Sequence, residues 1–273
     1  MAAVSDSSHL NPPLGPRSLW RWLALPLSGL AALAGWEAVV RLNHFPAFIL
    51  PLPGQVWQRF LTVLGNGDLA WHTSVTLGEV LGGLALGLVT ATALGYLIAK
   101  SPSLERALTP YLVASQAVPI VAIAPLLVIW FGAGLQSKVL ICALIVFFPI
   151  LINTVVGLRA IEPELHELMR SLRATRWQML IKLDVPGALP VWLGGLKVGA
   201  TLSVIGAVVG EFVGAQRGLG TLILSMNAQM DTAGTFSVFI ILAIVGVVMY
   251  QAMRIIERRF LFWSGDHMRA IGS

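Results

Sequence analysis

The chain has 273 residues, of which 56% are hydrophobic and only 11% are charged. This composition is typical of a membrane protein that crosses the bilayer several times and argues against a soluble domain. The net charge is +5, but no stripe of basic residues interleaved with aromatic residues is present, so we expect no binding of nucleic acid. The single cysteine, Cys142, lies in an apolar run and is interpreted as structural.

Six stretches of the chain are apolar and long enough to span a bilayer, whose core of about 30 Å needs about 20 residues per helix. They predict an all-α, polytopic membrane protein with a six-helix transmembrane domain at residues 20–263. A disordered tail at 1–19 and a second tail at 264–273 flank this domain. The first stretch could instead be a cleavable secretory signal, but it continues through Val40, so we favour a span. The stretches are 20–42, 75–99, 111–131, 139–158, 191–213 and 236–256.

The distribution of basic residues predicts the orientation of these spans. Six spans place both termini on one side of the membrane. If that side is the cytoplasm, thirteen of the 18 Lys and Arg residues lie inside, four lie outside, and Lys197 lies within a span. Because basic residues are enriched in cytoplasmic loops, we expect both termini and the polar segment at 158–190 to be cytoplasmic.

Prolines and glycines mark special positions in the predicted spans. Pro119 and Pro125 interrupt the third span and Pro149 interrupts the fourth. Each removes a backbone hydrogen bond that lipid cannot replace, so we expect kinks that face protein or a water-filled cavity. Glycines recur every four residues from Gly206 to Gly214 on the fifth span. They predict a face for close helix packing, with a moving or dimeric interface as the alternative.

The 158–190 segment is polar but carries helical signals. Nine of its 33 residues are charged, whereas 11% of the whole chain is. Pro163 stands at a favoured first-turn position of a helix, and four apolar residues then follow at i, i+3, i+4 and i+7. These residues are Leu165, Leu168, Met169 and Leu172. The pattern predicts a short amphipathic helix.

A second short helix is predicted after a turn at Arg173–Ala174. Thr175 and Gln178 have the spacing of a capping box, in which both side chains satisfy free backbone donors of a new helix. We expect this helix to end near Asp184, because Pro186 disfavours helical geometry at the residue before it.

Sequence motifs of catalysis are absent. None of the four lysines follows a glycine, so the chain has no phosphate-binding loop of the Walker A type. The five histidines are scattered without the spacing of a zinc hydrolase. We therefore expect neither an enzyme nor a metal site nor a bound cofactor in this chain.

Ionisable groups within spans are better functional candidates, because a charge in the bilayer costs about 2.5 to 3.5 kcal/mol unless it has a partner or water. Glu79 and Glu211 would lie toward the outer leaflet, and structural pairing and a place on a substrate path are equally good interpretations. Lys197 is expected to extend to the inner surface. Further candidates beside the prolines of the third and fourth spans are Gln116, Pro119, Phe147 and Asn153.

The residues of the 158–190 segment carry a resemblance to a known family. The runs Glu167-Leu168-Met169, Leu172-Arg173-Ala174-Thr175-Arg176-Trp177 and Val185-Pro186-Gly187-Ala188-Leu189-Pro190 resemble the cytoplasmic EAA loop of type I ABC transporter permeases. Other runs are similar to the nitrate/sulfonate/taurine group of these permeases: Leu50-Pro51-Leu52-Pro53, Phe147-Phe148-Pro149, Gly206 to Phe212 and Gly218-Leu219-Gly220. Ala114-Ser115-Gln116 and Gly195-Leu196-Lys197 look most like permeases for thiamine-precursor pyrimidines and riboflavin.

The resemblance implies an importer subunit in the bacterial inner membrane. It implies a second permease copy, which we expect to be identical, two ATPase subunits that bind ATP and Mg, and an external substrate-binding protein. The EAA loop would dock on the ATPase through Glu167, Leu172, Arg173, Ala174, Thr175 and Arg176. The chain departs from the family in having Arg173 where glycine is common, and Leu-Met where the motif has Ala-Ala.

Alternatives remain open at this point. The solute could be nitrate, a sulfonate, taurine or an aromatic acid instead of a heterocycle. A channel or ion-coupled secondary transporter would use Glu79 or Glu211 as an ion or proton site and need no ATPase.

Overall fold

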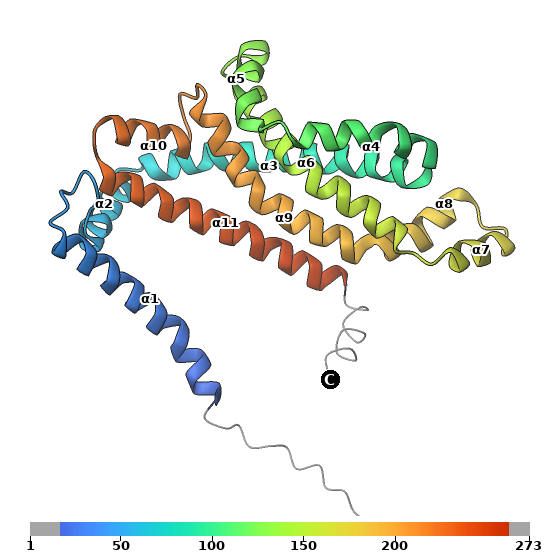
Figure 1. Cartoon of the computed structure of the whole chain (residues 1–273), viewed down its shortest axis with the longest axis horizontal. Helices are drawn as coiled ribbons and strands as arrows, with labels where there is room; N and C mark the ends of the chain where they lie inside the picture. The colour runs from blue at the N-terminus through green and yellow to red at the C-terminus, as the bar shows by residue number, and fades with distance from the viewer. Residues whose placement is uncertain (1–16, 262–273) are drawn as a thin grey trace, which may run out of the picture.

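The computed structural model describes residues 17–261, with side chains from residue 26 onward, and all regular structure in this part is helical. Four long helices form an elongated bundle (Figure 1): α3 (Asp68–Lys100), α6 (Leu135–Arg159), α9 (Val185–Phe212) and α11 (Thr232–Phe260). Helix α6 packs against both α3 and α9, and α9 packs against α11. The all-α membrane fold is confirmed. The predicted tails at 1–19 and 264–273 lie outside the described residues, except 17–19, where α1 begins.

The helices occur where the apolar stretches predict them. In the described part of the chain, four helical segments are individually long and apolar enough to cross a membrane: α3, α6, the continuous run Arg176–Phe212, and α11. Helix α1 (Arg17–Leu42) coincides with the first predicted span. It diverges from the bundle in Figure 1 and contacts it near its C-terminal end, where the ring centres of Trp36 and Phe236 of α11 lie 5.2 Å apart.

The third predicted span, 111–131, is not one kinked helix. It is divided between α4 (Pro102–Gln116) and α5 (Ile120–Phe131), which are bent by 95°. The break lies at Pro119, whose backbone is extended (φ −61°, ψ 119°) and precedes the first residue of α5. Proline disfavours helical geometry at the residue before it, here Val118, so the helix cannot continue through this point. Pro125 and Pro149, in contrast, lie inside α5 and α6.

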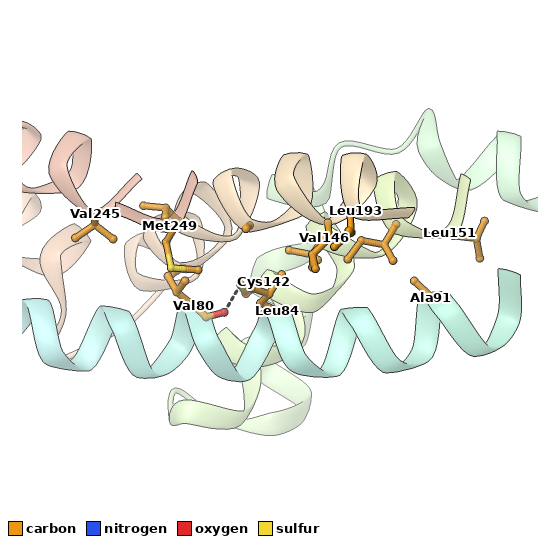
Figure 2. Close-up of a cluster of buried hydrophobic side chains, with 14 of the residues drawn as sticks. Val80, Leu84, Ala91, Cys142, Val146, Leu151, Leu193, Val245 and Met249 are labelled. Atoms are coloured by element: carbon orange, nitrogen blue, oxygen red, sulfur yellow. Dashed lines mark hydrogen bonds between the residues drawn. The ribbon is translucent and has the colours of Figure 1, made fainter. Parts of the chain in front are cut away.

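The core of the bundle is formed where α3 and α9 cross α6. Its buried members include Val80, Leu84, Cys142 and Val146 (Figure 2). A Cβ placed on Gly83 would lie 2.3 Å from the Cβ of Cys142, and one on Gly206 would lie 2.8 Å from the Cα of Cys142. The thiol of Cys142 donates to the carbonyl of Ser203 at 3.2 Å. Small residues therefore let three helices meet at one cysteine, which supports its structural interpretation.

The close-packing role of the glycines on the fifth span is confirmed for two of them. A Cβ on Gly210 would lie 3.3 Å from the Cα of Lys138, so Gly206 and Gly210 both face α6 of the same chain. Gly214 lies beyond the end of α9, with a φ of +130°.

Short helices lie at the two ends of the bundle (Figure 1). The end drawn at the left carries α2 (Pro53–Gly65) and α10 (Leu219–Ala228). Arg59 of α2 donates to Asp231 at 2.7 Å, and Asp231 accepts the amide of Gly234 to cap α11. The opposite end carries α7 (Pro163–Ser171), α8 (Arg176–Met179) and the π-helical turn η1 (Leu180–Asp184).

Candidate functional site

The turn between the two short helices of the 158–190 segment has the geometry of a Schellman motif. The amide of Ala174 donates to the carbonyl of Met169 at 2.9 Å, and the amide of Arg173 donates to that of Arg170 at 2.9 Å. These are the two bonds that define the motif, which normally has glycine at the position of Arg173. Arg173 adopts a φ of +55°, so it takes the left-handed conformation in place of glycine. The predicted turn at Arg173–Ala174 is confirmed.

The capping box after this turn is also confirmed. The amide of Gln178 donates to the hydroxyl oxygen of Thr175 at 3.2 Å, and the amide of Thr175 donates to the side-chain oxygen of Gln178 at 2.8 Å. The two side chains thus satisfy donors that the first turn of α8 leaves free. Residues 172–176 are therefore held in one defined path by bonds on both sides of the turn.

The second short helix does not end near Asp184, so that prediction is wrong. The π-helical turn η1 joins α8 to α9 without a break, and Val185 keeps helical geometry (φ −65°, ψ −52°) before Pro186. The amide of Val185 donates to the carbonyl of Leu180, five residues earlier. We attribute the continuity to this wider turn, because a π-bulge accommodates the hydrogen bond that a following proline cannot make.

Large apolar side chains of the segment are uncovered. Leu168 is 55% exposed, Leu172 is 69% exposed and Trp177 is 68% exposed, and no residue of α7 is buried. The apolar stripe predicted for α7 is therefore present, but this chain covers it only in part. The charged side chains of Glu167, Arg173 and Arg176 are exposed around it. Apolar residues ringed by charges are typical of a surface that binds another protein.

Three polar side chains tie the segment to the bundle. Asp184 is 1% exposed and accepts a hydrogen bond from Lys100 Nζ at 2.8 Å, while His166 Nε2 lies 3.0 Å from the same carboxylate oxygen. We call these residues the Lys100–Asp184–His166 cluster. The cluster was not predicted from the sequence, although an aspartate between the apolar residues Leu183 and Val185 was a usable signal.

Two further contacts hold the start of the segment. Arg159, at the end of α6, forms an ion pair with Glu105 of α4. Ile161 is buried, and a Cβ on Gly187 would lie 2.8 Å from its side chain. The segment is therefore fixed at its base while its tip, around Leu172, is exposed.

At the opposite end of the bundle the structure brings together Glu79 and Glu211, which the sequence placed near the outer leaflet. Glu211 is fully buried. Its carboxylate accepts the hydroxyl of Thr76 at 2.6 Å and the amide of Gly220, while the Thr76 oxygen accepts the amide of Leu219 at 2.9 Å. These bonds use backbone donors at the start of α10 and join this helix to α3 and α9. We call this group the Glu211–Thr76 cluster.

Gly218 completes this cluster because only glycine fits there. Its φ is +121°, and a Cβ would lie 2.1 Å from a carboxylate oxygen of Glu211. The amide of Gly218 donates to His72 Nδ1 at 2.9 Å. The Gly-Leu-Gly run at 218–220 is therefore the place where the backbone approaches the buried carboxylate.

Glu79 differs from Glu211 in having one free oxygen. The residue is 2% exposed, and its Oε2 has no hydrogen-bond partner among the described residues. It lines a cavity of about 780 Å³ together with Ser74, Lys138, Gln216 and Arg217, among others. A buried acceptor without a partner is costly, so this cavity is where a donor from a ligand would be stabilised.

The other candidates for a substrate path do not converge with Glu79. Gln116 is exposed beside the α4–α5 break, where Pro119 precedes α5. Phe147 packs edge-on against Phe148, with ring centres 5.3 Å apart. Asn153 donates to the carbonyl of Pro149 at 2.8 Å, and its side chain fills the space beside Gly195.

Lys197 does not need to extend to the membrane surface, contrary to expectation. Its Nζ lies 2.7 Å from a carboxylate oxygen of Glu257 on α11, and both side chains are largely buried. A charge within a span is stable when it has such a partner. In the described part of the chain, no group of three His, Cys, Asp or Glu residues could hold a metal ion.

Comparisons with known proteins agree with this architecture. A family model, the inner membrane component of binding-protein-dependent transport systems, matches residues 83–262. The chain is 47% identical over 247 residues to the riboflavin transport system permease protein RibX of Chloroflexus aurantiacus, covering 90% of this chain and 92% of that protein. It is 38% identical to the formylaminopyrimidine transport permease protein ThiX of Halalkalibacterium halodurans, covering 84% and 90%. It is 30% identical to the taurine transport system permease protein TauC of Escherichia coli, covering 94% and 98%.

A solved structure shares the fold. An inward-facing MetNI methionine ABC transporter structure matches with a TM-score of 0.61 and 21% identity, covering 68% of this chain and 93% of that chain. The family match includes α6, the 158–190 segment and α9, so it covers the exposed tip of the segment as well as the core. The chain belongs to the binding-protein-dependent family of inner membrane transport components and is the permease subunit of an ABC importer.

Proposed function

We propose that this permease imports an aromatic heterocycle across the bacterial inner membrane, with riboflavin as the first candidate and a thiamine-precursor pyrimidine as the second. The identity of 47% to a riboflavin permease, against 30% to a taurine permease, supports this order. The free energy would come from ATP hydrolysis in two partner ATPases, which bind ATP and Mg. An external binding protein would deliver the solute, and a second copy of the permease would complete the pathway.

The observation that carries the proposal is the uncovered apolar tip of the 158–190 segment. Leu172 is 69% exposed at a turn that hydrogen bonds hold on both sides. A preorganised apolar surface binds a partner with less loss of conformational entropy than a flexible loop. We place this tip, and both termini, on the cytoplasmic side, where the ATPase is. The residues proposed to contact the ATPase are Glu167, Leu172, Arg173, Ala174, Thr175 and Arg176.

Leu172→Asp tests the docking surface. The substitution puts a charge into the apolar contact, so we expect the affinity for the ATPase to fall by about tenfold or more. The measurement is the amount of ATPase that copurifies with the tagged permease. Leu42→Asp is the matched control, because Leu42 is 79% exposed at the end of α1. Equal copurification with both variants would exclude Leu172 from the docking surface.

Glu79 is proposed to line the substrate path because the residue lines a cavity and its Oε2 has no hydrogen-bond partner among the described residues. An imide or hydroxyl group of the solute would supply the missing donor. Other parts of the path would be lined by Gln116, Pro119, Phe147 and Asn153. Glu211 would stabilise the wall of the path by anchoring α10. We expect Glu79→Gln to raise the KM for riboflavin uptake by about tenfold, as for loss of a charged hydrogen bond. Ser74→Ala, on the same cavity, is the control.

The substrate and the energy source are tested together in proteoliposomes that contain permease, ATPase and binding protein, with ATP inside and no ion gradient. Uptake of riboflavin and not of taurine supports the proposal. Uptake of taurine alone would assign the chain to the sulfonate group. Uptake that requires an ion gradient and not ATP would favour an ion-coupled transporter.

A further inference from the structure

The 158–190 segment needs a mechanical connection to the membrane helices if an ATPase is to move them through it. Helix α7 buries none of its residues, so packing alone connects it weakly. The backbone joins its start to α6, and the buried Ile161 steadies that junction against Gly187. Neither contact reaches α3. Besides the packing of α3 against α6 and α9, the segment contacts α3 directly through polar side chains.

The Lys100–Asp184–His166 cluster supplies this connection. Asp184 belongs to η1, Lys100 is the last residue of α3, and His166 lies in the middle of α7. One carboxylate oxygen of Asp184 lies 2.8 Å from Lys100 Nζ and 3.0 Å from His166 Nε2. The other oxygen lies 2.8 Å from the same ammonium group. A single buried carboxylate of η1 thus contacts two other elements, α3 through Lys100, 84 residues away, and α7 through His166, 18 residues away.

Asp184 lies at the junction between the short helices and the membrane helix α9. It is the last residue of the π-helical turn, where α8 passes into α9. Such turns are frequent at functional sites and change the direction of a helix. A displacement of α7 and α8 therefore reaches α9 through the backbone of η1 and reaches α3 through Lys100 at the same point.

We propose that Asp184 is the positioning residue that makes α3 and α9 move as one unit with the ATPase-docking tip. Lys100 and His166 are its two partners. This inference rests on the proposed function, because it assigns the path by which ATP hydrolysis acts on the membrane helices. It assigns no contact with the ATPase or the solute to these three residues.

The test compares transport with hydrolysis in the reconstituted importer with its ATPase and binding protein. Asp184→Asn keeps the shape of the side chain and removes its charge. We expect the ATPase to copurify as with the wild type and to hydrolyse ATP, while riboflavin uptake per ATP falls by about tenfold, a size typical of coupling between distant sites. Asp184→Glu keeps the charge and should restore part of the ratio. A role in folding alone would not change uptake per ATP.

Two more variants keep the test decisive. His166→Ala leaves the Lys100–Asp184 pair in place and serves if Asp184→Asn does not fold, with an expected loss in the same direction. Arg106→Gln is the matched control, because Arg106 is exposed at the same end of the bundle and its side chain donates to the carbonyl of Pro102 within α4. A wild-type uptake ratio in Asp184→Asn or His166→Ala overturns the inference. Loss of the ATPase from a folded Asp184→Asn variant also overturns it, because the cluster would then shape the docking surface instead.

Failure of the proposed function has a different signature. If the wild-type permease binds no ATPase, the proposed coupling to ATP is wrong. If the wild type binds the ATPase and transports, the variants test the cluster alone.

Discussion

Where α10 meets α3 and α9, the polar groups of the Glu211–Thr76 cluster are hydrogen-bonded to one another, whereas at the end formed by α7 and α8 large apolar groups are left uncovered. Glu211 is fully buried and accepts bonds from Thr76 and Gly220. Leu172 and Trp177 are more than two-thirds exposed. A region whose polar groups are paired internally is complete within the chain. A region with uncovered apolar groups outside the bundle is where we propose that a partner binds.

The two ends also differ in the type of residue that adopts a left-handed backbone conformation. Gly218 has a φ of +121° and no room for a side chain, because Glu211 occupies that space. Arg173 has a φ of +55° and carries an exposed side chain. An arginine in this conformation costs about 1 to 2 kcal/mol relative to glycine. The buried end therefore requires glycine, while the exposed end tolerates strain.

Removal of the buried carboxylate should have the largest effect on stability. Glu211→Ala leaves the amide of Gly220 without its acceptor and leaves the hydroxyl of Thr76 only the more distant carbonyl of His72 at 3.1 Å. We expect the free energy of unfolding to fall by about 3 kcal/mol, measured by thermal unfolding in detergent. Glu167→Ala is the control, since Glu167 is exposed on α7 at the other end of the bundle and its loss should change stability by less than about 0.5 kcal/mol. Equal shifts would contradict the difference between the two regions.

Loss of the helix cap at the exposed end should have a smaller, local effect. Thr175→Ala removes the acceptor for the amide of Gln178 and should destabilise α8 by about 1 kcal/mol. The measurement is hydrogen exchange of the α8 amides, which should become faster. Thr175→Ser keeps the hydroxyl and should exchange as the wild type does. If hydrogen exchange of the α10 amides becomes faster to the same extent, the two ends are not independent.

The smallest expected effect has the opposite sign. Arg173→Gly removes the cost of the left-handed conformation and should stabilise the turn by up to about 1 kcal/mol. Exchange of the Ala174 amide, which donates to Met169, should become slower. Arg170→Gly, inside α7, is the control and should destabilise that helix by about 1 kcal/mol. Faster exchange at Ala174 in the Arg173 variant would show that the arginine side chain stabilises the turn.

Local features of this chain were predictable from the sequence, and contacts between distant residues were not. The capping box at Thr175–Gln178 and the turn at Arg173 depend on neighbours within a few residues, so their spacing is visible in the sequence. The contacts of Asp184 with Lys100 and of Glu211 with Thr76 join residues 84 and 135 apart. The periodic spacing of residues along a helix gives no information about such distant pairs.

Predictions from proline were the least reliable: one break is sharper than the predicted kink, and one predicted helix end is absent. Pro119 breaks a predicted span by 95°, whereas Pro186 follows a helix that continues through it. The difference lies in the backbone around each proline: η1 provides a wider turn before Pro186, while an extended backbone at Pro119 separates α4 from α5. Whether a helix breaks or continues at a proline depends on the helices packed around the site and is not encoded in the proline itself.

The position of Cys142 has a practical consequence for studies of motion in this transporter. Its thiol is fully buried at the point where Gly83 and Gly206 leave no free space, and it is the sole cysteine of the chain. Buried structural thiols react slowly with alkylating reagents. Pairs of cysteines for spin or fluorescent probes can therefore be introduced into the natural sequence without first replacing Cys142. Distances across the membrane helices become measurable during the ATP cycle in an otherwise unaltered protein.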